Sequence, residues 1–569
     1  MIATEFRTLL DALNAAPAQR EFVTSWVDED DCETVTFGEF RRRARRQAVL
    51  LRNHGVSQGD RVVILMPQGT AAMTVFVGAM LLGAVPAILA YPNFKVEPAK
   101  YRSGLAGVTA NLSARLVIVD EQFPDELLGH VTFGEAKLVR AADSADDGDN
   151  LALGDVGAEP NDLAFLQHSA GTTGLQKGVA LTHAAVLRQL QSLIQVLHID
   201  GSADRVYSWL PLYHDMGLIA CFMLPLVSHM PVVMQSPLDW VMRPESMLQL
   251  ISEYRCTLAW LPNFTFQFVP RRTPRENWER YDLSSARALI NCSEPVRAAS
   301  MEEFYQSFGG NGLRREALQS SYAMAENVFA VTQSGINGKR APAHIWADGQ
   351  RFRSEHIVVE VGAGTAGALS FLSSGQLLPG NEVRIVSDRD AILNGGEVGE
   401  ILIKSDCLFQ GYYNRSDLTA QALVDGWYYS GDLGFVLGDE LYVVGRKKDL
   451  LIIGGENIYP QDIEEIAASH PAIHDGRAVA LGLYNSDLGT EEIVLVAEVE
   501  RHELLHNPAA IENELRSHIV AGSGVAVKTI FLKPPKWIVK STAGKPARST
   551  TREKLLREHP ELQAGSAAS

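Results

Sequence analysis

Residues 168–178 read His168-Ser169-Ala170-Gly171-Thr172-Thr173-Gly174-Leu175-Gln176-Lys177-Gly178. Apolar runs flank this loop at 163–166 and 178–182, and a helical pattern begins only at His183, so we predict a strand on each side of it. Glycine N–H groups, hydroxyls and one lysine can surround phosphate oxygens with donors and positive charge. The stretch therefore favours a phosphate-binding loop between two strands.

A Walker A loop is the first alternative, and it would need a final Gly-Lys-Ser/Thr that opens a helix. Counted from Gly171, the second glycine would fall on Gln176 and the Ser/Thr on Gly178, so the motif is excluded. An ordinary Gly/Thr-rich surface turn stays open for the loop taken alone. Only motifs elsewhere in the chain can decide between that turn and a phosphate site.

Bulk composition indicates a globular protein of several domains, since the chain has 569 residues and 46% apolar content. A net charge of −17 argues against binding to nucleic acid or to an anionic membrane, which requires a basic face. Five scattered cysteines without a CxxC pattern predict neither a zinc site nor a disulfide framework. The N-terminus shows no signal peptide, so we expect a cytoplasmic protein.

The stretch Thr70–Tyr91 is almost wholly apolar and long enough to suggest a membrane span. Gly78, Gly83 and Pro86 interrupt it, so a buried helix followed by a turn and a strand is the better prediction. We therefore expect no stable membrane insertion.

The order of predicted elements gives an α/β fold. Strands alternate with amphipathic helices over residues 20–135 and again from the loop to about 335, which indicates mostly parallel sheets covered by helices. A small β-subdomain is predicted from three short strands, at 357–361, 382–386 and 400–404. An α+β unit after Gly445 is predicted from three further elements, a helix at 461–468, a strand at 492–499 and a helix at 508–519.

A second glycine motif, 362–367, fits the GxGxxG pattern of dinucleotide-binding proteins. That fingerprint must open a helix of several turns, whereas here only five residues follow before Ser373-Ser374-Gly375. A glycine-rich hairpin is the preferred interpretation, and NAD binding is not expected.

Further motifs follow the loop in a fixed order, and together they resemble the adenylate-forming ligases, which include acyl-CoA synthetases, nonribosomal adenylation domains and luciferases. They are Trp209-Leu-Pro-Leu-Tyr-His-Asp-Met-Gly217, Asn291-Cys-Ser-Glu-Pro-Val296, Ser321-Tyr-Ala-Met-Ala-Glu326, Gly426-Trp-Tyr-Tyr-Ser-Gly-Asp432, Gly445-Arg-Lys-Lys-Asp449 and Thr542-Ala-Gly-Lys-Pro-Ala-Arg548. Details within residues 213–217, 261–264, 294–296 and 459–464 resemble the fatty acyl-AMP ligase branch.

The resemblance covers about residues 30 to 550 and implies two domains. Residues 1–445 would form a large AMP- and acyl-binding domain, with two parallel-sheet subdomains and a small β-subdomain. Residues 446–569 would form a small, mobile α+β lid. The long spacer between Glu326 and Gly375, with an insertion at about 343–372, resembles the segment that restrains the lid in this branch and disfavours CoA as acceptor.

The resemblance also implies roles for individual residues. ATP would be bound by the loop and by five later motifs, with the set Ser169, Gly171, Thr172, Thr173, Gly174, Lys177, Ser293, Glu294, Tyr322, Ala323, Met324, Asp432, Arg446 and Lys545. The catalytic set would be Lys545, Glu326, Lys177, Thr172 and Thr173, and Glu326 would also ligate Mg²⁺. His214, Met216 and Asn263 would line the acyl pocket, and Lys448 would be the hinge.

Single residues allow plainer interpretations. Taken alone, Asp432 could be a turn residue, Glu326 a solvated charge and Lys545 a surface lysine. Ala170, Gln176 and Ala323 also depart from the family pattern, which leaves the acyl class and the rate open. Three functions remain: a fatty acyl-AMP ligase that loads an acyl carrier protein, an acyl-CoA synthetase, and a non-catalytic nucleotide-binding relative.

Overall fold

The computed structural model describes residues 6–92, 98–127, 136–141, 157–168, 177–335, 341–453, 456–485, 490–540 and 546–562. Loop residues 169–176 and the predicted catalytic Lys545 lie outside these ranges. The predictions for Ser169, Gly171, Thr172, Thr173 and Gly174 are therefore not placed by the structure. Among the described helices, none is both long and apolar enough to cross a bilayer.

The first sheet confirms the parallel α/β prediction for the N-terminal region. Its four strands are all parallel, in the order β4 (Val85–Ile88), β3 (Arg61–Leu65), β5 (Leu116–Val119), β6 (Lys137–Arg140). Helices α2 (Phe37–Asn53), α3 (Thr70–Leu81) and α4 (Pro98–Leu112) alternate with them. The apolar stretch from Thr70 is thus a buried helix, a turn and a strand, because α3 is buried on nearly all sides.

The second sheet has nine strands, and its six central strands are parallel. Their order is β17 (Gln376–Leu377), β14 (Ala330–Gln333), β13 (Leu318–Ala323), β12 (Ala288–Asn291), β11 (Leu258–Leu261), β9 (Val206–Ser208), β10 (Val232–Gln235), β1 (Glu21–Trp26), β2 (Cys32–Thr36). Its central strands are buried, as expected for parallel strands covered by helices. The associated helices are α1 (Leu9–Ala15), α5 (His183–Val196), α6 (Leu224–Ser228), α7 (Pro237–Met242), α8 (Ser246–Glu253), α9 (Thr265–Arg272) and α10 (Ala298–Phe308).

The two strands around the loop are confirmed. Strand β7 (Leu163–His168) pairs antiparallel with β8 (Gly178–Thr182), and α5 begins directly after β8. Thr182 caps that helix by accepting from the N–H of Ala185. The residues before and after 169–176 are therefore neighbours across a ladder, with His168 opposite Gly178.

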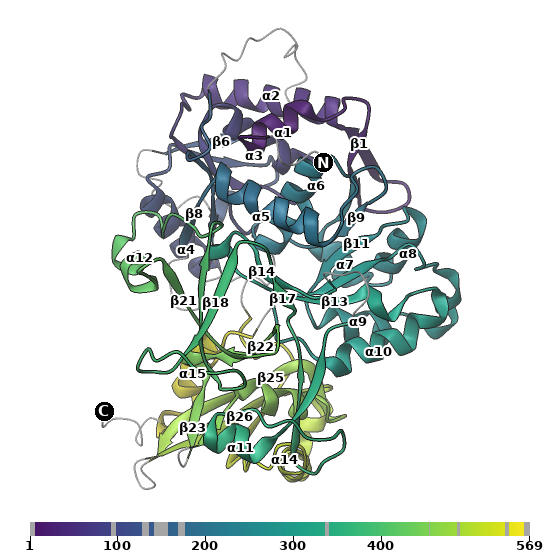
Figure 1. The fold of residues 1–569 in the computed structure, drawn as a ribbon, viewed down its shortest axis with the longest axis vertical. Helices are drawn as coiled ribbons and strands as arrows, with labels where there is room; N and C mark the ends of the chain where they lie inside the picture. Colours follow the sequence, from purple (N-terminus) through teal and green to yellow (C-terminus); the bar gives the residue numbers. More distant parts are fainter. Residues whose placement is uncertain are drawn as a thin grey trace.

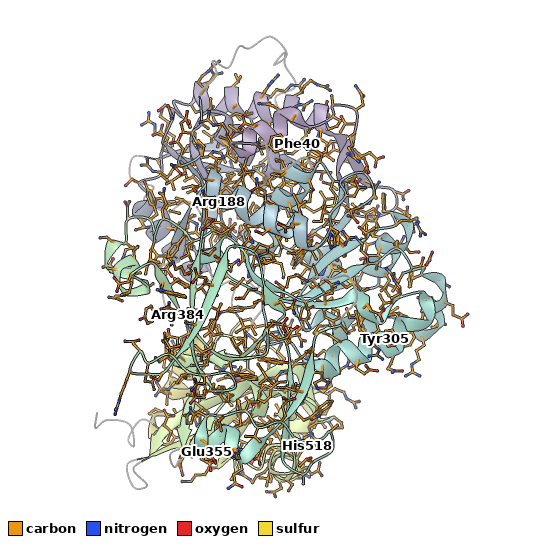
Figure 2. All side chains as sticks on the ribbon, viewed as in Figure 1. Phe40, Arg188, Tyr305, Glu355, Arg384 and His518 are labelled. Atoms are coloured by element: carbon orange, nitrogen blue, oxygen red, sulfur yellow. The ribbon has the colours of Figure 1, made fainter. Side chains whose placement is uncertain are left out.

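The β-subdomain is confirmed as an antiparallel sheet of β18 (Asn381–Val386), β19 (Gly399–Ser405), β21 (Trp427–Leu437), β20 (Leu423–Val424) and β22 (Glu440–Arg446). Arg384 marks β18 in Figure 2. Helix α12 (Ser416–Ala422) lies before β20.

The predicted strand at 357–361 is wrong. Residues 357–361 make only isolated bridges, Ile357 with Glu397 and Ala347 with Glu360. The insertion instead forms β15 (His344–Asp348), α11 (Gly349–Glu355) and β16 (Ala368–Leu372), because Asp348 caps α11 and turns the chain away before it returns to pair with β15. The glycine motif leads directly into β16, so within residues 341–453 it opens no dinucleotide-binding helix.

The C-terminal α+β unit has its own apolar core, which spans Leu451 to Ile530. Its elements are β23 (Leu451–Ile453), β24 (Glu456–Ile458), α13 (Pro460–Ala468), β25 (Ile473–Asn485), β26 (Thr490–Val499), α14 (Pro508–Ser523), β27 (Thr529–Lys533) and α15 (Arg548–Glu558). Figure 1 shows these yellow elements at one end of the molecule, with α11 of the insertion among them.

Candidate active site

One corner of the site joins strands β13 and β21. The hydroxyl of Tyr322 donates a 2.6 Å hydrogen bond to Asp432 Oδ2, and Arg446 Nε lies 3.6 Å from Asp432 Oδ1. Asp432 and Arg446 face each other across the β21–β22 ladder. Burial and the Asp432 charge raise the pKa of Tyr322 well above its usual value, so its hydroxyl remains a donor. The structure thus brings together three residues predicted to bind the nucleoside.

A second corner is built around Glu326, in the short 3-10 helix Ala325–Asn327 that follows β13. Tyr412 donates a 2.8 Å hydrogen bond to Glu326 Oε1. The ammonium of Lys177 lies 4.4 Å from the centre of the Tyr412 ring, within cation–π distance. Tyr412 therefore contacts two residues of the predicted catalytic set, and Glu326 is not a freely solvated charge.

Backbone contacts hold Tyr412 beside the loop strands. Ala180 N–H donates to Gly411 O at 3.1 Å, Tyr413 N–H donates to Gly178 O at 2.8 Å, and Val179 bridges Tyr412. Sequence reasoning missed Tyr412, and the only local signal was the dipeptide Gly411-Tyr412 on a segment without a strong pattern. Its contacts arise because chain segments far apart in sequence meet at β8.

The surroundings of Glu326 suit one carboxylate ligand of Mg²⁺. Its side chain is half-buried, and burial raises its carboxyl pKa while the Tyr412 hydrogen bond opposes that rise. No cluster of three or more His, Cys, Asp or Glu side chains suited to a metal occurs in the described part of the chain. A magnesium ion here would therefore take its other ligands from phosphate oxygens and water, as Mg²⁺ commonly does.

The predicted acyl side begins at the motif containing His214. His214 Nδ1 lies 2.6 Å from Asp215 Oδ1, which also accepts the Met216 N–H at 2.7 Å. Met216 opens a π-helix, Met216–Met223, a rare form that is frequent at functional sites. The hydroxyl of Ser293 lies 3.7 Å from Met216 Sδ, so the predicted adenine and acyl residues meet here.

Asn263 has a structural task that the sequence did not indicate. Its Oδ1 accepts from Asn291 Nδ2 at 2.8 Å and from the Arg297 N–H at 3.1 Å. Its Nδ2 donates to Ser300 Oγ at 3.0 Å. These bonds join β11, β12 and α10, so contact between Asn263 and an acyl chain stays a prediction.

Next to Asn263 lies an aromatic cluster that sequence reasoning also missed. The rings of Trp209 and Trp240 stack at 3.8 Å and 3°, and Phe264 stands edge-on to both at 5.9 Å. The N–H of Phe264 donates to Glu294 at 3.1 Å, which ties this cluster to the predicted adenine side. Trp240 lies in α7, outside all of the motifs, so no sequence pattern was a reason to place it at the site.

The remaining predicted residues lie on the edges of the site. Ala323 and Met324 directly follow Tyr322 and are half-buried, with the Met324 N–H donating to Phe329 O at 2.8 Å. Lys448 lies in the 3-10 helix Lys447–Asp449, which connects β22 to the C-terminal unit.

Ion pairs join the two parts of the chain on either side of that connection. Arg297, next to α10, pairs with Asp462 at 3.0 Å and Glu465 at 2.9 Å on α13. Arg271 on α9 pairs with Asp475 at 2.5 Å. The C-terminal unit is thus held against the same region that carries Asn263 and Glu294.

The pattern of the AMP-binding enzyme family matches residues 11–413. The 4-hydroxyphenylalkanoate adenylyltransferase of Mycobacterium tuberculosis is 30% identical and covers 96% of this chain and 92% of its own. The medium-chain-fatty-acid–[acyl-carrier-protein] ligase JamA of Moorena producens is 30% identical over 98% of this chain and 96% of its own.

Solved structures of fatty acyl-adenylate ligases have a similar fold. A structure from a study of fatty acyl-adenylate ligases from E. coli and L. pneumophila has a TM-score of 0.89, with 28% identity and 99% coverage of both chains. A fatty acyl-adenylate ligase from L. pneumophila, in complex with acyl adenylate and pyrophosphate, has a TM-score of 0.73, with 26% identity and 97% coverage of both chains.

Proposed function

This chain belongs to the AMP-binding enzymes, within their fatty acyl-AMP ligase branch, and we propose that it loads a fatty acid onto an acyl carrier protein. ATP and the acid form acyl-AMP with release of pyrophosphate, and a phosphopantetheine thiol then takes the acyl group. The observation that carries the proposal is the hydrogen bond between Tyr322, near the end of β13, and Asp432 on β21, with Glu326 in the short helix that directly follows β13.

The nucleotide is held by the large domain. Asp432 accepts hydrogen bonds from the ribose hydroxyls beside Arg446, and Tyr322 packs against adenine near Ser293 and Glu294. Lys177 and the loop residues Thr172 and Thr173 hold the phosphates. Glu326 would hold Mg²⁺, which would supply neutralising charge to the phosphate oxygens.

In the first half-reaction, a carboxylate oxygen of the acid attacks the α-phosphorus and the bond to pyrophosphate breaks. Negative charge grows on the phosphoryl oxygens and on the leaving group, so catalysis is positioning plus electrostatic stabilisation. Lys177 and Lys545 supply positive charge beside the oxygens on which this negative charge grows. In the second half-reaction the thiol sulfur attacks the acyl carbonyl carbon and AMP leaves.

The carrier is preferred over CoA because of how the insertion packs. Phe352 on α11 is 2% exposed, and its ring centre lies 5.6 Å from that of Tyr459. His356 Nδ1 lies 2.9 Å from Asn457 Nδ2 on β24. The insertion therefore contacts the unit that begins, in this proposal, at residue 446, and it restricts rotation of that lid about Lys448.

A coupled assay tests the proposal. The protein is incubated with ATP, Mg²⁺ and a panel of acids that includes medium-chain fatty acids and a 4-hydroxyphenylalkanoic acid, and pyrophosphate is measured. CoA and a phosphopantetheinylated carrier are then compared as acceptors, with Asp432→Asn as the matched control. Acyl-CoA formation as rapid as carrier loading would indicate that the protein is an acyl-CoA synthetase. If no pyrophosphate is released with any acid, a non-catalytic nucleotide-binding relative would be favoured.

A further inference from the structure

Glu400 on β19 lies opposite a bulge in β21, residues 430–432, that carries Asp432. Its side chain is buried, and its Oε1 accepts the N–H of Gly431 at 3.1 Å. Ser430 Oγ accepts the Asp432 N–H at 3.0 Å and donates to Ile401 O at 2.6 Å. Gly431 has φ +71°, a conformation in which glycine is favoured. Two neighbouring residues of β19 thus fix the position of the Asp432 backbone.

The second oxygen of Glu400 reaches the connection between the domains. Lys447 Nζ lies 3.0 Å from Glu400 Oε2 and 3.0 Å from Asp388 Oδ1. Lys447 directly precedes Lys448, the proposed hinge. One buried carboxylate therefore contacts both the 430–432 bulge and the last residue before the proposed hinge.

The residue after the hinge is held by the other domain. Asp449 Oδ2 accepts from Arg548 at 2.9 Å, and Arg548 also binds both oxygens of Glu464 on α13, at 2.9 and 2.6 Å. Lys447 is thus anchored to the large domain and Asp449 to the small one. Lys448 is the residue between these two anchors, which is the position expected of a hinge.

We propose that Glu400 is a positioning residue that couples nucleotide binding at Asp432 to the orientation of the C-terminal domain through Lys447. The inference rests on the proposed function for the nucleotide site and the hinge. A ribose bound to Asp432 fixes the 430–432 bulge, the bulge fixes the Glu400 carboxylate, and that carboxylate fixes Lys447. Within the protein, the links from Asp432 to Lys447 are hydrogen bonds or an ion pair of 3.0 to 3.1 Å.

Four substitutions separate the two contacts of Glu400. Glu400→Ala removes both, whereas Glu400→Gln keeps an acceptor for Gly431 and loses the charge that holds Lys447. Lys447→Met removes the ammonium and keeps the aliphatic stem. Asp388→Asn is the matched control, because it changes the exposed partner of the same ammonium and leaves the 430–432 bulge untouched.

The probe is AMP, and two quantities are measured for each variant. Calorimetry gives AMP affinity, and energy transfer between dyes at Gln421→Cys on α12 and Asn513→Cys on α14 gives domain orientation. Both label positions are exposed. The background is Cys32→Ser, since Cys32 is exposed and the other four cysteines are buried.

AMP is expected to change energy transfer in the wild type and in Asp388→Asn. Lys447→Met and Glu400→Gln should bind AMP within about threefold of wild type and lose that change, while Glu400→Ala should also lose affinity by tenfold or more. A wild-type-like response in Lys447→Met and Glu400→Gln, or AMP binding without any change in the wild type, overturns the coupling alone. Failure of the wild type to bind AMP overturns the proposed function as well.

Discussion

The hydroxyl of Tyr412 lies 2.8 Å from Glu326 Oε1, and the face of the same ring lies 4.4 Å from Lys177 Nζ. One side chain thus orients the proposed metal ligand and supports the proposed phosphate-binding lysine. Phe409 adds a backbone link, since its N–H donates to Glu326 O at 2.9 Å. The 409–412 segment is therefore part of the site, although it belongs to none of the motifs.

Tyr412→Phe should lower kcat for adenylation by about ten- to a hundredfold, because a hydrogen bond to a charged group contributes about 1.5–3 kcal/mol. Tyr412→Leu should lower it further by removing the ring beneath Lys177. Pyrophosphate release measured against Mg²⁺ concentration tests both, with Tyr413→Phe as the control. Equal rates for Tyr412→Phe and wild type would show that the Tyr412 hydroxyl does not contribute to adenylation.

Lys545→Ala should cut adenylation by two to three orders of magnitude, since a lost transition-state charge contact costs about 3–4 kcal/mol. ATP affinity should change little, because the large domain holds the nucleotide. Single-turnover pyrophosphate release and ATP binding are measured on the same preparation. Near-normal release from this variant would reject the role assigned to Lys545.

Asp432→Ala should raise the KM for ATP strongly with the fold intact, and Tyr322→Phe should raise it less because Asp432 keeps its position beside Arg446. The discriminating measurement compares ATP with 2′-deoxy-ATP. Wild type should discriminate between them and Asp432→Ala should not. Equal discrimination in both proteins would contradict the ribose assignment.

Loosening the insertion should admit CoA. His356→Ala removes the contact with Asn457, and Phe352→Ala weakens the packing on Tyr459. A bias of a few kcal/mol suppresses a conformation about a hundredfold or more, so acyl-CoA formation should rise while adenylation persists. Shortening within 345–370 should act in the same direction. Arg351→Gln on the exposed side of α11 is the control, and unchanged acceptor preference in both variants would refute the role of the insertion.

Stability should fall between pH 6.5 and 4. Burial lowers the pKa of His168 and of His183 to about 4 in each case. The unfolded chain binds protons in this range that the folded chain does not, so each histidine removes up to about 3 kcal/mol as pH falls. Urea midpoints at pH 7, 5.5 and 4.5 measure this loss. His183→Gln should reduce the slope, and an unchanged slope would contradict its buried neutral state.

The sequence was a good guide wherever local pattern decides structure. The strand pair around the loop, the helix from His183 and the buried helix at Thr70 all follow from periodicity and capping residues. The strand predicted at 357–361 was wrong because it also rested on local pattern alone, namely a run of β-forming residues. Its edges find single bridges to Glu397 and Ala347 because α11 and a glycine turn separate it from any continuous partner.

Partners across the chain could not be predicted in this way. The phenol of Tyr412 meets Glu326, 86 positions away, only because its segment is bonded to β8. Likewise, the amide of Asn263 is used to join three elements, and Trp240 comes from a helix without a motif. Such contacts depend on the packing of whole elements, which residue spacing does not encode.

The π-helix Met216–Met223 follows the proposed acyl-pocket residue His214. We therefore expect a change in its length, and not only a substitution, to alter which acids are accepted. A π-helix has more residues per turn than an α-helix, so losing one residue between Gly217 and Met223 would let the segment relax to the commoner form. Residues on one side of the deletion would rotate by about 100° relative to the other. Gly217 itself cannot take a side chain, since a Cβ there would lie 2.3 Å from Pro211 O. Because Met216 is a proposed acyl-pocket residue, we expect deletion of one codon here to change acid preference in a single step, and libraries that vary length would reach changes that point mutations do not.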